Sequence, residues 1–143
     1  MRAQFIPLLV MVSVLITAEV LLGKKNEMPT ALSVRQQVDS EVFNLEKNLK
    51  AAKSSEARWK FLESSKELIK ALRSKSSRQF EQDEIYMDYI YFSLRDFPSK
   101  AEFKSEKCGQ YRSSIIANYN PQFETAPDPA IAKTLGLLGI ICK

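Results

Sequence analysis

The chain contains no histidine and only four glycines among its 143 residues. Without histidine it cannot build Ser–His or Cys–His nucleophiles, histidine general bases, or histidine-ligated zinc, iron and haem sites. The scarcity of glycine leaves no glycine-rich loop for phosphate groups, and the serine pairs at 64–65 and 113–114 stand in no GxSxG or SxxK motif. These absences favour a non-enzymatic role, with no cofactor and no metal site expected.

Charge is mixed along the chain rather than one-sided. There are 21 basic and 17 acidic residues, which gives a formal net charge of +4. Because lysines and glutamates interleave, no face is built for nucleic acid. With 45% hydrophobic residues, the chain is neither a disordered tail nor a multi-pass membrane protein. Its length supports one domain with one hydrophobic core.

The first residues predict a secretory signal peptide over residues 1–18. Arg2 supplies a short positive start, and the apolar run that follows ends at Ala18, a small residue suited to cleavage. An uncleaved anchor over residues 5–22 is the alternative, although Glu19 would then place a costly carboxylate in the bilayer. We therefore expect an exported protein, periplasmic or secreted, that contacts a membrane only through this segment if it is retained.

Cys108 and Cys142 are the only cysteines in the chain. An even number of cysteines in an exported protein favours a disulfide. Chain-entropy arguments give a bridge over this loop length a stabilisation of about 4 kcal/mol. The spacing is far too long for a CxxC redox motif, so we expect a structural bridge that ties the last predicted helix to the middle of the one before it.

The spacing of apolar residues predicts an all-α fold, a small bundle of four to five helices. The bundle occupies a single domain over residues 33–143, after a polar lead-in at 19–32. Apolar positions recur at helical steps in each segment, and serine capping boxes or an Asp-Pro pair mark the helix starts. The predicted helices span about 33–53, 56–74, 79–96 and 100–119, with a last one starting at Pro129.

Two of these helix assignments have alternatives. No glycine or proline separates the first two helices, so residues 33–74 are also compatible with one bent helix. Residues 85–94 are rich in aromatic and β-branched types that also favour strands. The acidic residues and the capping signal before this segment favour a helix instead. Because apolar residues lie on every side of that helix, we predict a central position for it in the bundle.

Trp59 and three basic residues form the candidate binding site. Trp59 lies beside the apolar stripe of its predicted helix, so we expect this ring at the surface. Lys66, Lys70 and Arg73 follow one face of the same helix, which suits an acidic partner or an anionic surface. We therefore predict an exported, non-enzymatic interaction or structural module of the cell envelope or extracellular space, whose partner is another protein.

Two other function classes remain open from the sequence. The aromatic residues of the third predicted helix are compatible with a cavity for a small ligand or a lipid, although they are also ordinary core residues. Glu81, Glu84 and Asp88 share one helix side and raise the weaker alternative of a carboxylate-dependent hydrolase. No opposing acid or base can be placed against them from the sequence, and a solvated helix entrance explains them equally well.

Overall fold

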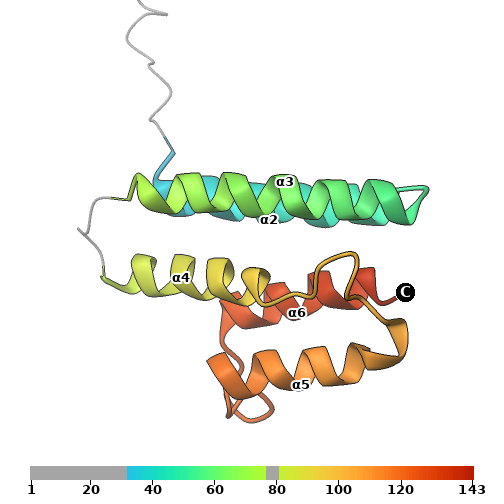
Figure 1. The fold of residues 1–143 in the computed structure, drawn as a ribbon. Coiled ribbons are helices and arrows are strands. Elements are labelled where there is room, and N and C mark those ends of the chain that lie inside the picture. The colour runs from blue at the N-terminus through green and yellow to red at the C-terminus, as the bar shows by residue number, and fades with distance from the viewer. Residues whose placement is uncertain (1–31, 77–80) are drawn as a thin grey trace, which may run out of the picture. The chain divides into compact units, whose positions relative to one another are not determined.

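A computed structural model describes residues 32–76 and 81–143 of the protein. The predicted signal peptide, its alternative as an anchor and the lead-in up to residue 31 lie outside these residues. The described part contains five α-helices and no strand, which confirms the predicted all-α class (Figure 1). The helices are α2 (Val34–Ala51), α3 (Ser55–Ser74), α4 (Glu81–Arg95), α5 (Cys108–Tyr119) and α6 (Pro129–Ile141), with a short 3₁₀ turn, η1 (Ser105–Lys107), before α5.

Serine caps separate α2 from α3. The Ser33 hydroxyl accepts a hydrogen bond of 3.2 Å from the Gln36 amide, and the Gln36 side chain accepts one of 2.9 Å from the Ser33 amide. This completes the predicted capping box. The chain then leaves the helical conformation at Ala52, and the Ser54 hydroxyl caps the start of α3. The bent-helix alternative is therefore wrong, because the second cap restarts the helix.

The α5 helix begins later than the sequence predicted. Only half of the expected capping box forms at Ser99, where the backbone amide donates to the Glu102 carboxylate. The Ser99 hydroxyl donates to the same carboxylate instead of accepting from the Glu102 amide, which donates to the Ser99 carbonyl. The chain nevertheless turns away from a helix there, and α5 starts only at Cys108. This departure places the Phe103 ring against Trp59, with the two ring centroids 5.3 Å apart. A tertiary contact has therefore overridden a local start signal.

The five helices pack in layers around α4 and α6. Figure 1 shows α2 and α3 as an antiparallel pair, with α4 and α6 beneath them and α5 on the far side of α6. Since α4 contacts each of the other four helices, its predicted central position is confirmed. It is not buried on every side, however, because Ile85 near its start is 47% exposed.

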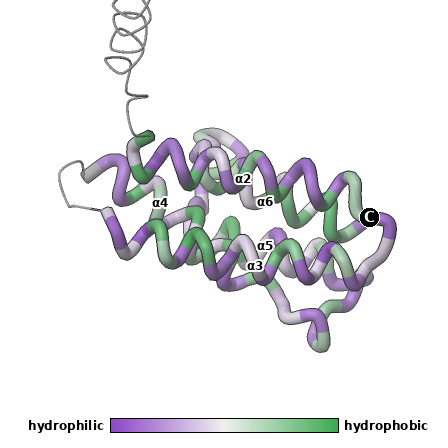
Figure 2. The backbone as a smooth tube through the Cα atoms, turned by 90° about the horizontal axis from the view of Figure 1, so that it is seen from above, coloured by the Kyte–Doolittle hydropathy of each residue, from purple (hydrophilic) through white to green (hydrophobic). Residues whose placement is uncertain are grey.

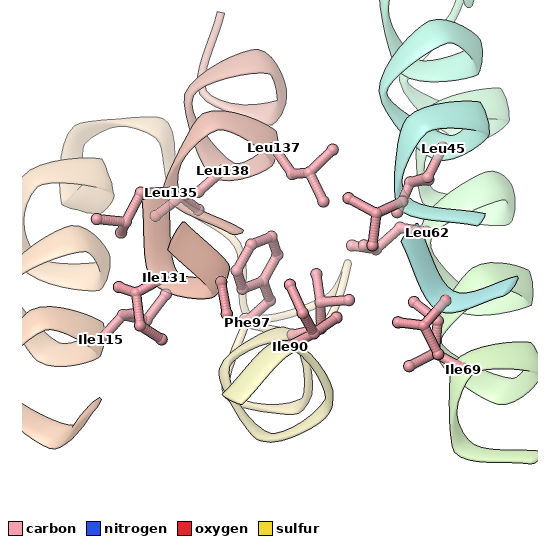
Figure 3. Close-up of a cluster of buried hydrophobic side chains, with 14 of the residues drawn as sticks. Leu45, Leu62, Ile69, Ile90, Phe97, Ile115, Ile131, Leu135, Leu137 and Leu138 are labelled. Atoms are coloured by element: carbon pink, nitrogen blue, oxygen red, sulfur yellow. The ribbon is translucent and has the colours of Figure 1, made fainter. Parts of the chain in front are cut away.

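The hydrophobic core lies between these layers. Figure 2 shows hydrophobic and hydrophilic residues recurring in alternation along the helices, as expected for helices with one buried side. In Figure 3, Ile90 and Phe97 lie between the side chains of α6 and those of the α2–α3 pair. Burial of each large apolar side chain contributes about 1.5–3 kcal/mol. The completely buried ones include Val38, Leu45, Leu49, Leu62, Ile69, Ile90 and Ile131.

The most apolar of the described helices is α6, and it carries a polar pair inside the core. Thr134 and Ser93 of α4 are both fully buried, and their hydroxyl oxygens lie 2.9 Å apart in a hydrogen bond. Thr134 also donates to the Ala130 carbonyl one turn earlier, so both hydroxyls have partners. Among the described helices, including α6, none combines the length and the apolarity needed to cross a membrane.

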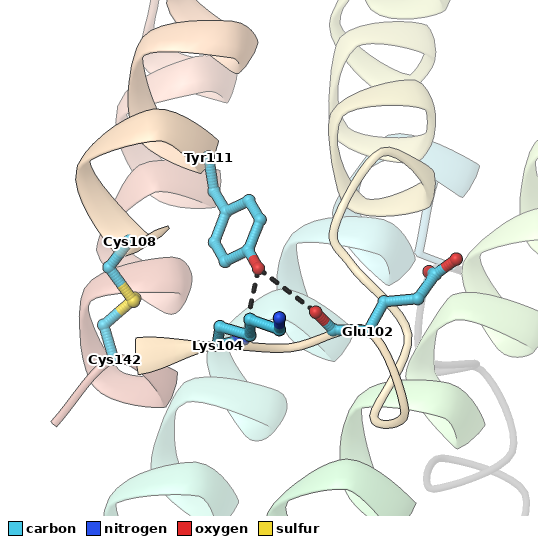
Figure 4. Close-up of a disulfide and its surroundings, with 5 residues drawn as sticks. All are labelled: Glu102, Lys104, Cys108, Tyr111 and Cys142. Carbon is cyan, nitrogen blue, oxygen red and sulfur yellow. Dashed lines mark hydrogen bonds between the residues drawn. A yellow bond between two sulfur atoms is a disulfide. The ribbon is translucent and has the colours of Figure 1, made fainter. Parts of the chain in front are cut away.

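A disulfide joins the last two helices, as predicted (Figure 4). Cys108 and Cys142 are bridged with their Cα atoms 6.1 Å apart. Because α5 is shorter than expected, the bridge holds its first residue rather than its middle, and it meets the residue just past α6. The Tyr111 hydroxyl fixes the preceding segment by accepting from the Lys104 amide and donating to the Glu102 carbonyl.

Candidate functional site

The structure separates Trp59 from the three basic residues with which it was grouped. Its side chain is only 6% exposed and packs edge-to-face on Phe103. Phe103 in turn stacks on Tyr111 with centroids 6.0 Å apart. The prediction of a surface tryptophan is therefore wrong, because the segment before α5 crosses this end of α3 and covers the ring.

Lys66, Lys70 and Arg73 lie on the side of α3 that faces α4. Two hollows are found between these helices, and together we call them the α3–α4 groove. One hollow, of about 310 Å³, lies between the middle of α3 and the end of α4, and the other, of about 380 Å³, lies between the end of α3 and the first half of α4. Their lining residues are Glu63, Lys66, Glu67, Lys70, Tyr91 and Arg95 in the first, and Arg73, Ser74, Ser76, Glu84, Met87 and Asp88 in the second.

Arg73 is the most firmly held cation of the α3–α4 groove. Its Nε donates to the Asp88 carboxylate, and its guanidinium lies 5.3 Å from the centroid of the Tyr91 ring and 4.9 Å from that of Phe92. The hydrogen bond to Asp88 raises the pKa of Arg73 further above its usual range. This residue therefore joins α3 to α4 through one ion pair and two cation–π contacts.

The other three cations of the groove are held more loosely. Lys66 lies 3.1 Å from Glu63, and Lys70 lies 3.8 Å from Glu67 on the same helix. Arg95 stacks on the Phe92 ring at 4.8 Å, and its side chain is 57% exposed. Lys66 is largely covered, since only 15% of its side chain is exposed. Lys70 and Arg95 are exposed, and exposed ion pairs are each worth about 0–1 kcal/mol, so a partner can exchange the contacts of these two residues for its own at little cost.

Charge is distributed unevenly along the groove. Three cations and two carboxylates line the first hollow, so its formal charge is +1. One cation and two carboxylates line the second, so its formal charge is −1. Tyr91 and Met87 supply apolar surface in the two parts. The groove is therefore complementary to a segment that carries an acidic group and a basic group in the opposite order.

A second polar cluster joins α2, α4 and α6. The Tyr86 hydroxyl donates to Asp39, and Lys133 donates to both groups at 2.7 Å. The guanidinium of Arg35 covers the Tyr86 ring at 4.4 Å and pairs with Asp83 at 2.5 Å. Sequence reasoning missed this cluster, because its members come from three separate helices and share no spacing pattern.

The pKa values in this cluster follow from its hydrogen bonds. Burial opposes ionisation of Asp39, yet the hydrogen bonds from Lys133 and Tyr86 outweigh it and lower the pKa of Asp39. Burial likewise opposes the charge on Lys133, and the hydrogen bonds that it donates to Asp39 and Tyr86 raise its pKa. Burial and the contact with Asp39 raise the pKa of Tyr86. Tyr86 therefore stays protonated at neutral pH, and the cluster acts as a clasp between helices rather than as a base.

The carboxylates of α4 give the hydrolase alternative little support. Glu84 and Asp88 do line the same hollow, but Asp88 is engaged by Arg73. The side chain of Glu81 lies outside the described part of the structure. Across the described residues, no group of three or more Cys, Asp or Glu side chains is arranged to hold a metal ion.

The aromatic residues of α4 pack against neighbouring side chains. Tyr89 meets Tyr119 edge-on with centroids 6.4 Å apart, and Tyr91 meets Phe92 in the same manner at 5.1 Å. Burial and a hydrogen bond to Asp96 raise the pKa of Tyr119 to about 12. These rings therefore contribute to helix packing, and Tyr91 also lines the α3–α4 groove.

The α3–α4 groove brings Lys66, Lys70 and Arg73 together with Glu84 and Asp88, all of which were singled out in the sequence. Tyr91 was noted only among the aromatic residues of its helix, and Arg95 had no signal, because the place of both in the groove depends on α4 lying beside α3. No protein-family model matches the chain, and no match is found among curated proteins or among solved structures.

Proposed function

We propose that the protein is an exported, non-enzymatic helical module that binds another protein through the α3–α4 groove, in the cell envelope or the extracellular space. The observation that carries the proposal is the ring of exchangeable charges around Tyr91. Arginine and tyrosine are enriched among the residues that dominate binding energy at protein interfaces. A partner segment with charges in the opposite order would meet both ends of the groove.

The core supports a binding role because two exposed cations of the groove play no part in holding the helices together. The helices are held by buried apolar side chains, the disulfide and the clasp at Asp39. Lys70 and Arg95 take part in none of these, and their side chains are 60% and 57% exposed. Charge at these positions therefore contributes little to folding and remains available for recognition.

Export is supported by the predicted leader together with the disulfide. The apolar run that ends at Ala18 has the length and flanks of a signal peptide. Disulfides persist in oxidising compartments, and the two cysteines of this chain are paired with each other.

The binding proposal is tested by capture from the native compartment with charge-reversed variants. The double substitution Lys70→Glu with Arg95→Glu should abolish recovery of the partner and leave the melting temperature within a few degrees of wild type. The double substitution Lys47→Glu with Lys53→Glu, at two exposed positions in α2 and just after it, makes the same charge change away from the groove and should retain the partner. Equal recovery by the wild type and the double variant would contradict the proposal.

Export is tested by intact mass and thiol accessibility. Protein recovered from outside the cytoplasm should lack residues 1–18 and should be lighter by the two hydrogens of a cystine. Neither thiol should react with an alkylating agent before reduction. Full-length protein found inside the cell, with both cysteines alkylated in the native state, would refute export.

A further inference from the structure

A cleft lies between α5 and α6, beside the disulfide. Its volume is about 230 Å³, and its walls are formed by the disulfide, Leu135, Leu138, Gly109 and Gly139, with Arg112 at the edge. All of these groups except Arg112 are apolar or present only backbone. Such a lining favours an apolar group over water.

The two glycines of the cleft have no role in the fold itself. Neither adopts a positive φ, and a Cβ atom built on either one meets nothing within 4 Å. Glycine in a helix costs about 1 kcal/mol relative to alanine. The physical effect of these residues is to keep the cleft open, because any side chain there would project into it.

The size of the cleft restricts what it can hold. An apolar cavity of about 150 Å³ is sufficient for benzene, whereas sites for drug-sized ligands start at about 300 Å³. At about 230 Å³, the α5–α6 cleft fits a single short hydrocarbon tail. Its walls would cover only part of a long lipid or a polycyclic ligand.

Arg112 determines which charge a bound ligand should carry at the mouth of the cleft. Its guanidinium lies 3.1 Å from the Glu124 carboxylate and 5.4 Å from the centroid of the Phe123 ring, and its side chain is 44% exposed. A guanidinium binds carboxylates through two parallel hydrogen bonds. An incoming carboxylate can therefore share or replace Glu124.

From these observations we infer that the α5–α6 cleft binds a medium-chain fatty acid, with its hydrocarbon tail against Leu135 and Leu138 and its carboxylate on Arg112. This inference does not depend on the proposed function of the α3–α4 groove, which lies between other helices. Binding at the two sites can be measured separately.

The experiment is calorimetric titration of the oxidised full-length protein with octanoate. Wild type should bind saturably. Gly139→Leu, which fills the cleft, should weaken binding by at least about tenfold. Gly136→Leu is the matched control, because it makes the same change in the same helix, also into open space, at a position that does not line the cleft. It should bind as wild type does.

The charge at the cleft mouth is tested by a second set of titrations. Arg112→Gln should weaken octanoate, and Glu124→Gln should strengthen it by removing the competing carboxylate. Octanol, which has a similar tail and no charge, should bind more weakly than octanoate to wild type. The inference is overturned if wild type shows no saturable binding, if Gly139→Leu binds as wild type does, or if octanol binds as tightly as octanoate.

Discussion

Lys133 on α6 donates a hydrogen bond of 2.7 Å to Asp39 on α2, across 94 positions of sequence. The Tyr86 hydroxyl of α4 contacts both groups, so three helices meet at one polar point. The contact lies at the border of a largely apolar core. It therefore fixes the relative positions of these helices in a way that non-directional apolar packing does not.

The clasp formed by Asp39, Tyr86 and Lys133 predicts that the free energy of unfolding depends on pH through the ionisation of Asp39. Its pKa is lower in the folded state, because hydrogen bonds from Lys133 and Tyr86 outweigh burial. The ionised carboxylate therefore stabilises the fold above about pH 4, and this contribution is lost as the pH falls below that value. Urea unfolding of Asp39→Asn should show a smaller loss of stability than wild type between about pH 5 and pH 2.

A matched carboxylate on the same helix serves as control for this prediction. Glu46 forms a surface pair with Lys50 one turn away, so Glu46→Gln should keep the pH dependence of wild type. At neutral pH, Asp39→Asn should cost about 1 kcal/mol of unfolding free energy, less than the roughly 1.5–3 kcal/mol usual for a charged hydrogen bond, because the site is partly exposed. Identical pH profiles for Asp39→Asn and wild type would contradict the role of the clasp.

Removal of the Trp59 ring should destabilise the core. Trp59→Ala should lower the free energy of unfolding by about 3–5 kcal/mol, as measured by chemical denaturation and circular dichroism. Phe61→Ala on the same helix should cost far less, because Phe61 is 37% exposed. As Trp59 is the only tryptophan, its native fluorescence should be blue-shifted and shift red on unfolding. Similar small losses for both variants would argue against burial of Trp59.

Loss of the disulfide should remove about 4 kcal/mol of stability, since the bridge closes a span of 34 positions. The double variant Cys108→Ser with Cys142→Ser and chemically reduced wild type should show the same decrease in unfolding free energy. Agreement between the two would assign the effect to the cross-link rather than to the reagent. A decrease below about 1 kcal/mol would show that α6 is docked without the bridge.

The buried hydroxyl pair should show coupling between α4 and α6. Ser93→Ala and Thr134→Val each remove one partner of the 2.9 Å hydrogen bond and should each cost about 1–2 kcal/mol. The double variant should lose less than the sum, with a coupling energy of about 1 kcal/mol in a double-mutant cycle. Strictly additive losses would mean that the two hydroxyls do not interact in solution.

A glycine on the exposed side of α6 offers a stabilising substitution. A Cβ atom at Gly136 meets nothing within 4 Å, so Gly136→Ala should raise the free energy of unfolding by about 1 kcal/mol through helix propensity alone. Ala132→Gly, also exposed on α6, should lower it by a similar amount. Thermal unfolding of both variants checks the prediction, and a destabilising Gly136→Ala would show that the position is covered by something else.

Local patterns in the sequence were sufficient for four of the five described helices, but not for the start of α5 or for the packing. The recurrence of Val38, Val42, Leu45 and Leu49 predicted α2, because one buried stripe requires those steps. The cap at Ser33 acts within one helical turn and was equally readable. The disulfide followed from the presence of only two cysteines.

The features that the sequence did not reveal depend on partners distant in the chain. Trp59 is covered by Phe103, which lies more than one helix away and shows no spacing relation to it. The same contact accounts for the turn after Ser99, where the local capping signal had predicted the start of a helix. For the α3–α4 groove, helical steps placed Lys66, Lys70 and Arg73 on one face, but Tyr91 and Arg95 join them only after α4 packs alongside.

The position of α6 also has a consequence for when the protein can fold. This helix packs against α2, α4 and α5, yet it follows all of them in the order of synthesis. Until the ribosome has released residues 129–141, the sides of α2, α4 and α5 that α6 covers stay open. The α2–α3 and α3–α4 contacts can form before then, so the last step of folding closes α6 over a core that is already partly assembled.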